Sequence, residues 1–316
     1  MTKRFGSSNV ASGEPAHAGD SALPAFLMGS PVGYSAALPT NAWMEDSDPA
    51  DLAIDSAVAI REFHELYRFV AQSALVYLLP GDATRPRQVL VAGAGFVPVH
   101  LNQRNLAVLP GAQSEIRAAN MPPTAHLLAS LGYETLTTPF NFGGESEIRH
   151  LRDNVYIGGF GTGTERGTYA WMREHLAMRI VEIEQVDPYL LQLNNIAFPI
   201  SGNEILVCTE VLSEAEIADI EKVANVIDVP VDLAYAGACG GIRMGDCVLN
   251  STSLPSLKKG NEDYRFEVAK HKLLEKLCAA RSLDLRFFHL GQFDKCGALL
   301  SDLLMTLNPE GPARIP

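Results

Sequence analysis

The stretch Leu190-Leu-Gln-Leu-Asn-Asn-Ile-Ala-Phe-Pro-Ile200 places the amides Gln192 and Asn194 inside a mostly apolar run. On both sides of it, short apolar segments alternate with segments whose apolar residues recur at helical spacing. The predicted strands are 25–28, 75–79, 88–91, 106–109, 133–137, 155–157, 179–183, 205–208, 226–229, 241–244, 247–250 and 284–288. The predicted helices are 50–74, 113–131, 165–178, 213–224, 262–281 and 297–304. Short strands that alternate with medium-length helices indicate an α/β protein.

The first residues have a different composition from the rest of the chain. Residues 1–24 are rich in Gly, Ser, Ala and Pro and show no periodicity. We therefore predict a flexible N-terminal tail over 1–24. The length of 316 residues suits one domain or two.

Overall charge and cysteine usage restrict the partners and the compartment. A formal net charge of −12 argues against nucleic acid and against anionic membrane surfaces. The sequence has no apolar run of about 18 residues and no apolar segment behind Lys3 and Arg4, so we expect neither a membrane span nor a secretory signal. The five cysteines are widely spread and include no C-x-x-C pair, which fits reduced thiols in a cytoplasm.

The sequence contains no signature of a metal or nucleotide site. The eight histidines lack H-E-x-x-H or a similar ligand spacing. The segment Gly158-Gly-Phe-Gly-Thr-Gly163 follows a predicted strand, but its glycines miss the G-x-G-x-x-G spacing. We therefore expect no metal and no cofactor, and a small molecule as the binding partner. A homodimer is compatible with the sequence.

Several short blocks occur in an order that resembles one enzyme family. They are Phe26 to Met44, Val91-Ala-Gly-Ala-Gly95, Phe140-Asn-Phe-Gly-Gly-Glu145, the stretch 190–200, Ala238-Cys-Gly-Gly-Ile-Arg-Met-Gly245 and Gly291-Gln-Phe-Asp-Lys-Cys296. Together they resemble the guanidine-modifying enzymes: arginine deiminases, dimethylarginine dimethylaminohydrolases, arginine dihydrolases and amidinotransferases. The resemblance implies the pentein fold, a five-bladed α/β propeller in which ββαβ units form a closed ring. It also implies that residues 25–316 form a single domain.

Two positions of the family's catalytic segment have lost their ionisable groups. Gln192 stands where the family has histidine, and Asn194 stands where it has aspartate. The family's cysteine nucleophile corresponds to Cys296, and its last acid in the third block corresponds to Glu145. The resemblance thus assigns catalytic positions to Cys296, Glu145 and Gln192. An amide cannot take up a proton as a general base must, so His289 is a candidate replacement base.

The positions that hold the substrate in relatives are also neutral here. Ser35, Asn141 and Asn194 replace carboxylates, and Gly163 replaces an arginine that takes the substrate carboxylate in relatives. The predicted substrate-binding residues are Ser35, Asn41, Asn141, Asn194 and Arg243. A buried guanidinium without carboxylates costs several kcal/mol. We therefore expect a pocket whose one carboxylate is Glu145, and we expect unmodified arginine to be a poor ligand.

Simpler roles exist for the same residues. Cys296 precedes an apolar segment and could be a buried structural thiol, Glu145 could cap a turn, and Asn41 could shape its loop. An unassisted thiol has a pKa near 8.5, which leaves only a few per cent as thiolate at neutral pH.

Three hypotheses follow. The first is an enzyme that acts on a modified arginine through Cys296, in specialised metabolism. The second is a non-catalytic pentein that binds a ligand or a protein partner. The third is an ordinary amidinohydrolase or amidinotransferase that uses plain arginine with a base from elsewhere in the chain.

Overall fold

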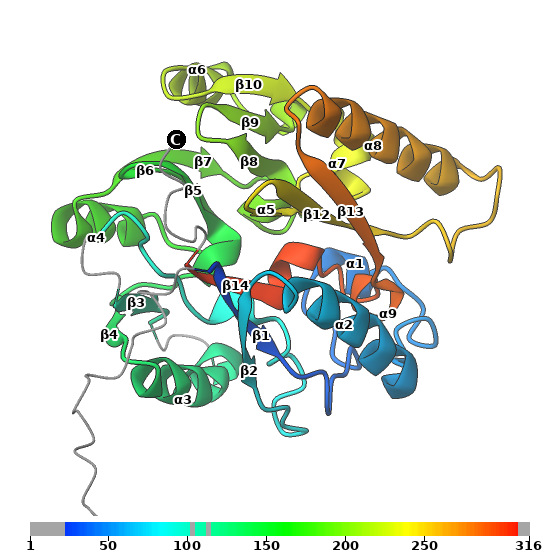
Figure 1. The fold of residues 1–316 in the computed structure, drawn as a ribbon, viewed down its shortest axis with the longest axis horizontal. Helices are drawn as coiled ribbons and strands as arrows, with labels where there is room; N and C mark the ends of the chain where they lie inside the picture. Colours follow the sequence, from blue (N-terminus) through cyan, green and yellow to red (C-terminus); the bar gives the residue numbers. More distant parts are fainter. Residues whose placement is uncertain (1–22, 102–104, 112–114, 309–316) are drawn as a thin grey trace, which may run out of the picture.

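The computed structural model describes residues 23–101, 105–111 and 115–308, with backbone only over 115–122. All but the last two residues of the predicted tail, 1–24, lie outside this range. The described chain alternates strands and helices, so the predicted α/β class is confirmed. Figure 1 shows helices α3, α4, α6 and α8 toward the outside and strands toward the middle. Among the described residues, no helix is both long and apolar enough to cross a membrane.

Four sheets share one pattern, in which an antiparallel strand pair is followed by a helix and a parallel strand. The first contains β14 (Leu304–Asn308), β1 (Ala25–Gly29), α2 (Ser56–Val70) and β2 (Leu75–Leu79). The second contains β5 (Ile148–Arg152), β6 (Val155–Phe160), α4 (Gly167–Leu176) and β7 (Arg179–Glu184). The third contains β8 (Ala197–Ser201), β9 (Glu204–Val207), α6 (Glu214–Glu221) and β10 (Asn225–Asp228). The fourth contains β11 (Ile242–Met244), β12 (Cys247–Thr252), α8 (Glu262–Ala279) and β13 (Asp284–His289).

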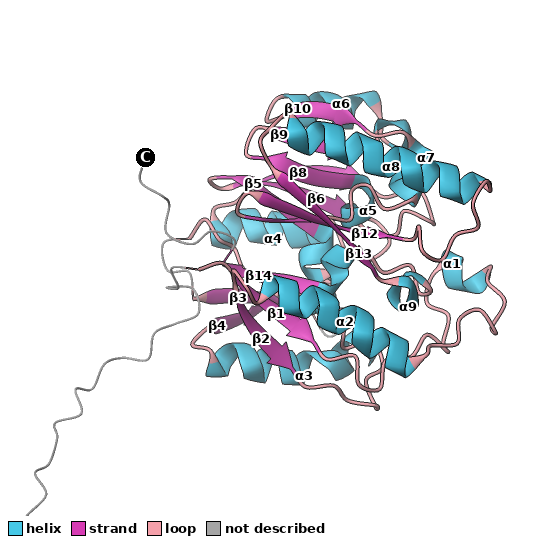
Figure 2. Ribbon diagram, turned by 45° about the vertical axis from the view of Figure 1, so that its right-hand side comes forward, coloured by secondary structure: helices cyan, strands magenta, loops and turns pink. Residues whose placement is uncertain are grey.

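A fifth sheet has the same order in a reduced form. Strands β3 (Leu106–Leu109) and β4 (Glu134–Thr137) pair in parallel, with α3 (Glu115–Ser130) between them in the chain. An isolated antiparallel bridge from Phe96 to Val108 stands in place of the first strand. In Figure 2 the strands again lie between α6 and α8 on one side and α2 and α3 on the other. The strand pairing links no sheet to the next among the described residues, so the closed five-bladed ring stays a prediction.

Short helical turns precede the first strand of several units. They are η2 (Val91–Ala94), η3 (Gly144–Glu147), α5 (Leu193–Ile196) and η5 (Leu300–Leu303). These turns contact one another: η2 lies against η3 and η5, and α5 lies against η3. Segments that are far apart in the sequence therefore meet at one place, and this place holds the candidate site.

The first unit shows how local sequence fixes the position of a site segment. Asp55 caps α2 by accepting hydrogen bonds from the N–H groups of Ala57 (2.9 Å) and Val58 (3.0 Å). The apolar face of α2 buries Phe63 and Leu66 in a cluster that also contains Phe293. Phe293 belongs to the one-turn helix α9 (Gly291–Asp294), so the packing of α2 fixes the turn that carries Cys296.

Some predicted elements differ from the structure. No strand forms at 88–91, where the chain turns into η2. The segment 297–304, predicted as a helix, contains the single turn η5 and then begins β14. Strands β5, β8 and β14 were not predicted; β8 contains Pro199, which cannot donate to a strand ladder and weakens the strand pattern.

Candidate active site

A cavity of about 380 Å³ opens where the short turns meet. Its walls come from the loop before α1 (Ala42–Glu45), from η2, η3 and η5, from the start of α5 and from the turn after α9. The polar side chains that line it include Asn41, Arg87, Glu147, Gln192, Cys296 and Asp302. Of the predicted site residues, Cys296, Gln192 and Asn41 share this cavity.

Cys296 is held firmly in the cavity wall. Its side chain is 2% exposed. Its Sγ lies 2.8 Å from the Tyr34 hydroxyl and 3.3 Å from the carbonyl oxygen of Phe293. The Asn41 side chain donates a hydrogen bond to the carbonyl of Cys296 (2.9 Å) and accepts one from Met44 N–H (2.9 Å). Asn41 thus connects the loop at α1 to the cysteine turn.

The electrostatics around Cys296 favour the protonated thiol. Burial raises the pKa of Cys296, while the charge of Arg87 and the hydrogen bond from Tyr34 oppose that rise. Burial also raises the pKa of Tyr34, so this hydroxyl keeps its proton. The described residues lining the cavity include no histidine. The described lining of the cavity therefore offers Cys296 no imidazole as a base.

The two amides of the 190–200 stretch have different surroundings. Gln192 is half-buried and lines the cavity at the start of α5. Asn194 is fully buried and does not line it. Its Nδ2 donates to Ser301 Oγ (3.0 Å) and to Asp302 Oδ1 (2.8 Å), which joins α5 to η5. The placement of Asn194 thus gives it a bracing function between two turns.

The cavity is also lined by two carboxylates that the sequence analysis did not identify. Glu147 is fully buried, and its Oε2 accepts hydrogen bonds from Gln185 Nε2 (2.5 Å) and Leu193 N–H (3.1 Å). Asp302 accepts from Ser146 Oγ (2.8 Å) through Oδ1 and from the N–H of Leu299 (2.8 Å) through Oδ2. The expectation that Glu145 is the one carboxylate of the pocket is therefore wrong.

Glu145, Asn141 and Ser35, three of the predicted site residues, are engaged outside the cavity lining. Glu145 Oε2 accepts a hydrogen bond from Thr306 N–H (2.5 Å), and burial raises the pKa of Glu145 against that bond and the charge of Arg149. Asn141 binds the loop before α4 through its main chain, with its N–H donating to Glu165 (3.1 Å). Ser35 Oγ accepts from Ala37 N–H (3.2 Å) in its own turn. None of these three predicted residues lines the cavity.

Arg87 is the cation among the described residues that line the cavity, whereas the sequence analysis predicted Arg243 there. Its guanidinium contacts Thr40 Oγ1 and Met44 Sδ. Arg243 donates instead to the carbonyls of Ile200 (2.9 Å) and Gly245 (2.9 Å) and does not line the cavity.

Arg166 and His289 also lie outside the cavity lining. Arg166 pairs with Glu182 (2.6 Å) along a separate surface groove beside β7 and α6. His289 contacts Thr252 O (3.1 Å) and Ser256 Oγ (3.2 Å). Its place gives no support to a role as the base for Cys296.

The arrangement of strands and turns matches solved structures over nearly the whole chain. The N-terminal domain of ArgZ bound to product, an arginine dihydrolase from the ornithine–ammonia cycle in Cyanobacteria, aligns with a TM-score of 0.77 at 19% identity. The alignment covers 91% of this chain and 98% of that domain. The chain has the α/β fold of the penteins.

Two further pentein structures extend the likeness. Unliganded AgrE aligns with a TM-score of 0.77 at 18% identity, over 91% of this chain and 39% of AgrE. A dimethylarginine dimethylaminohydrolase adduct with S-methyl-L-thiocitrulline aligns with a TM-score of 0.66 at 15% identity, over 90% and 99% of the two chains. At these identities the likeness shows an α/β fold in common with these structures and assigns no activity by itself. No family model and no curated protein sequence matches the chain.

The site residues that the sequence analysis missed had weak local signals. Glu147 lies two residues after Glu145, just beyond the end of the block 140–145, so this second acid was the available hint. Asp302 lies six residues after Cys296, in a segment predicted as helix. Arg87 lies in an irregular loop that no block covered. The described residues contain no group of three or more His, Cys, Asp or Glu arranged to hold a metal ion.

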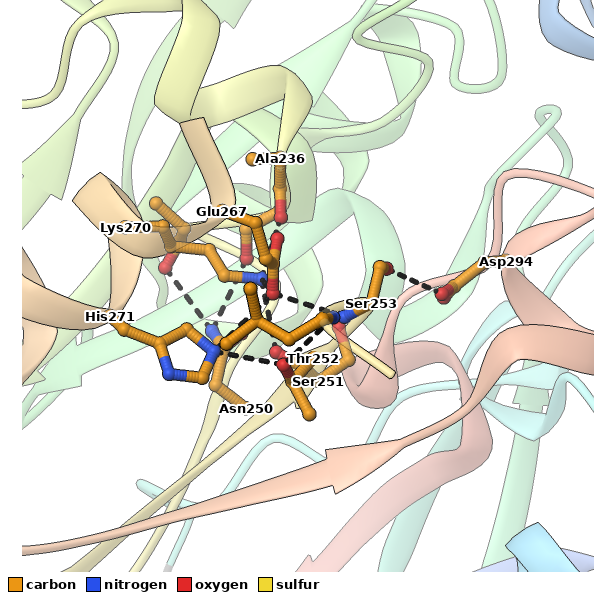
Figure 3. Close-up of polar contacts among 12 residues, drawn as sticks. Ala236, Asn250, Ser251, Thr252, Ser253, Glu267, Lys270, His271 and Asp294 are labelled. Atoms are coloured by element: carbon orange, nitrogen blue, oxygen red, sulfur yellow. Dashed lines mark hydrogen bonds and ion pairs between the residues drawn. The ribbon is translucent and has the colours of Figure 1, made fainter. Parts of the chain in front are cut away.

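A second buried polar cluster lies behind the cysteine turn (Figure 3). Lys270 is 1% exposed and pairs with Glu267 Oε1 at 2.8 Å. The same Oε1 accepts from Ser253 N–H (3.0 Å), and Ser253 Oγ donates to Asp294 Oδ2 (2.9 Å). Asp294 ends α9, two residues before Cys296. This cluster ties α8 to the cysteine turn.

Proposed function

We propose that the chain is a divergent enzyme of the amidinohydrolase or amidinotransferase type. Its substrate would be an arginine-derived or otherwise modified guanidino small molecule, and its nucleophile Cys296. The observation that carries this proposal is that Cys296 shares one cavity with two carboxylates, Glu147 and Asp302, and one guanidinium, Arg87. ArgZ, with the same fold, is an arginine dihydrolase, which supports this class of chemistry.

The charged groups suit the two ends of an amino-acid-like ligand. Arg87 presents a guanidinium that can bind a carboxylate in a bidentate manner. Glu147 and Asp302 present oxygens that can accept hydrogen bonds from an amidine, guanidine or urea N–H. Gln192 and Asn41 add neutral donors and acceptors at the cavity wall.

The protonated thiol suggests how a modified guanidine would react. A guanidine of lowered basicity, such as an N-hydroxyguanidine, is partly neutral near pH 7 and can accept the thiol proton on nitrogen. The Cys296 sulfur then forms a bond to the central carbon of the protonated group. The C–N bond to the leaving nitrogen breaks as that nitrogen departs as an amine. Water or a second amine then attacks the carbon and breaks its bond to sulfur. Attack by water makes the enzyme a hydrolase, and attack by an amine makes it a transferase.

A specific observation favours the non-catalytic alternative. The Cys296 sulfur has two hydrogen-bond contacts, to Tyr34 and Phe293, and burial raises its pKa. A structural thiol in a ligand-binding pentein would have the same surroundings. The alternative therefore predicts binding of a guanidino or urea ligand, or of a protein partner, without turnover.

Turnover by matched variants tests the proposal. Wild type, Cys296→Ala and the control Cys247→Ala are incubated with arginine, N-hydroxyarginine and citrulline, and products are measured by mass spectrometry. We expect the modified guanidine to be turned over by wild type and by Cys247→Ala, which changes a half-buried thiol outside the cavity lining. Equal turnover by Cys296→Ala would exclude the covalent mechanism. Rapid turnover of plain arginine by wild type would favour the ordinary amidinohydrolase instead.

We also propose the finer statements on organisation and setting. Residues 25–316 would form one domain and close into a ring of five units, because the unit pattern recurs five times with one reduced copy. The five cysteines are free, which fits a reducing cytoplasm. A modified arginine as substrate would fit specialised metabolism. Size-exclusion chromatography with light scattering would decide between monomer and homodimer.

A further inference from the structure

Arg149 is a buried cation behind the cavity. It is the second residue of β5 and is 8% exposed. No described residue accepts a hydrogen bond from its Nε or Nη2. Buried arginines normally satisfy their fork of N–H donors. The positive charge of Arg149 therefore contributes more to its surroundings than its hydrogen bonds do.

Three carboxylates belong to the turns beside the strand that carries Arg149. Glu145 and Glu147 precede it by four and two residues in η3. Asp302 reaches the same segment from η5, because its Oδ1 accepts a hydrogen bond from Ser146 Oγ at 2.8 Å. Burial lowers the pKa of Arg149, and the charges of the three carboxylates oppose that change. A guanidinium stays charged even so.

We propose that Arg149 is an internal counter-cation that neutralises the carboxylates of the cavity, so that the site selects a ligand whose reacting end is uncharged. This inference rests on the proposed function for the identity of that ligand, a neutral guanidine derivative or urea in place of a guanidinium. The charged groups in and beside the cavity are then three carboxylates and two guanidiniums, those of Arg149 and Arg87. Without Arg149, the same cavity would attract a cation.

The comparison with Arg243 separates this role from ordinary bracing. Arg243 is likewise the second residue of the first strand in its unit, β11. Its guanidinium donates hydrogen bonds to two backbone carbonyls, those of Ile200 and Gly245. Arg149 has the equivalent place in the unit of β5 and leaves two donor nitrogens without an acceptor among described residues. Equivalent positions thus carry the same residue type with different surroundings.

Charged thiol reagents measure the cavity potential at Cys296 without any knowledge of the substrate. Wild type is treated with a cationic and a neutral methanethiosulfonate of similar size, and modification of the Cys296 peptide is followed by mass spectrometry. The ratio of the two rates is normalised to that of a small free thiol. We expect a normalised ratio no higher than about tenfold for wild type, because the two guanidiniums leave one carboxylate charge uncancelled. A strong preference for the cationic reagent, or no modification of Cys296, would overturn the inference.

Variants with opposite effects complete the experiment. Arg149→Met should raise the cationic-to-neutral ratio about tenfold, the effect of one unit charge at about 10 Å in a protein interior. Arg149→Lys keeps the charge and should keep the ratio. Glu145→Gln, which lies outside the cavity lining, should lower the ratio. The control Arg152→Met removes an arginine that donates to Gly202 O and Val223 O and should leave the ratio unchanged.

The outcomes separate the two proposals. If Arg149→Met fails to fold, as judged by circular dichroism, Glu145→Gln alone decides the inference by the direction of its change. Ratios that stay within twofold of wild type in the folded variants overturn the counter-cation. A protein that shows the expected ratios but turns over no guanidine or urea keeps the inference and loses the proposed catalytic function.

Discussion

The molecule contains two buried clusters of charge that are built differently. In the cluster of Figure 3, Lys270 Nζ donates to Glu267 Oε1 (2.8 Å), Ala236 O (2.8 Å) and Ser251 O (3.0 Å). Three donors meet three acceptors. In the cluster behind the cavity, Arg149 is also buried, but its Nε and Nη2 have no acceptor among the described residues. The first cluster lies between α8 and the cysteine turn, and the second lies behind the cavity wall.

This difference indicates which cluster maintains the fold and which serves the site. A buried charge is tolerated when ion pairs and hydrogen bonds to close partners offset the free energy of its desolvation. Lys270 has such partners, so its removal should mainly lower the free energy of unfolding. Arg149 has charge partners without an ion pair within 4.0 Å among the described residues, so its removal should be felt mainly as a changed cavity potential. Buried polar groups left partly unsatisfied recur at functional sites.

The largest expected effect is on stability, from Lys270→Met. This change leaves Glu267 buried without its cation and removes the donor to two carbonyls. We expect a loss of about 3–5 kcal/mol in the free energy of unfolding, measured by urea denaturation followed by circular dichroism. Lys272→Met on the exposed side of α8 is the matched control, with an expected change below about 0.5 kcal/mol. If Arg149→Met costs as much stability as Lys270→Met, the contrast between the clusters fails.

The next effect is a pH dependence that belongs to the Lys270 cluster. Burial raises the pKa of Asp294 from 3.8 to about 7, with Glu267 and Glu62 adding to the rise and Ser253 and Lys270 opposing it. The native carboxyl therefore holds a proton that the unfolded chain has already lost. Its contribution to stability is complete below about pH 4 and is lost as the pH rises through about 7.

Denaturation at a series of pH values tests this linkage. Asp294 as a whole residue is half-buried. We therefore expect stability to fall by about 2 kcal/mol between about pH 5 and pH 8, which is less than the full shift would give at about 1.4 kcal/mol per pKa unit. Asp294→Asn should flatten the profile over this range, and the exposed Asp263→Asn should not. A wild-type stability that rises with pH would contradict the assignment.

A smaller effect concerns the Cys296 thiol in the cavity wall. The hydrogen bond from Tyr34 opposes the rise in the pKa of Cys296 that burial causes. Tyr34→Phe should therefore slow alkylation of Cys296 by iodoacetamide about three- to tenfold at a fixed pH, since one pKa unit corresponds to a tenfold change in thiolate. The rate is followed by peptide mass spectrometry, with Tyr67→Phe as the control. Faster alkylation would show instead that Tyr34 shields the sulfur.

The sequence predicts regular, locally coded elements well. Strands 75–79 and 106–109 have the same bounds as β2 and β3. Strand β5 was missed because Arg149, His150 and Arg152 suggest an exposed segment. Arg149 is nevertheless buried, since its counter-charges include Asp302 from a turn about 150 residues further along. No local pattern contains that information.

Some residues of the candidate site could be predicted from local sequence, and others could not. Cys296, Gln192 and Asn41 lie in blocks that resemble known enzymes, and the structure places all three at one cavity. Glu147 and Asp302 join it only because η3 and η5 converge. The roles predicted for Ser35, Asn141 and Asn194 stay predictions, with their side chains outside the cavity lining. Convergence of turns depends on the whole fold, so it could not be derived from any one segment.

The smallest expected effect comes from Arg243→Met, which tests whether position or surroundings decide the role of an arginine. Arg243 loses two hydrogen bonds to carbonyls at a partly exposed place, so we expect a stability loss of about 0.5–1 kcal/mol in urea denaturation. The ratio of cationic to neutral reagent rates at Cys296 should change less than twofold. A tenfold change would restore the substrate-binding role predicted for Arg243. It would also show that an arginine satisfied by backbone carbonyls can set the cavity potential as strongly as Arg149 is proposed to do.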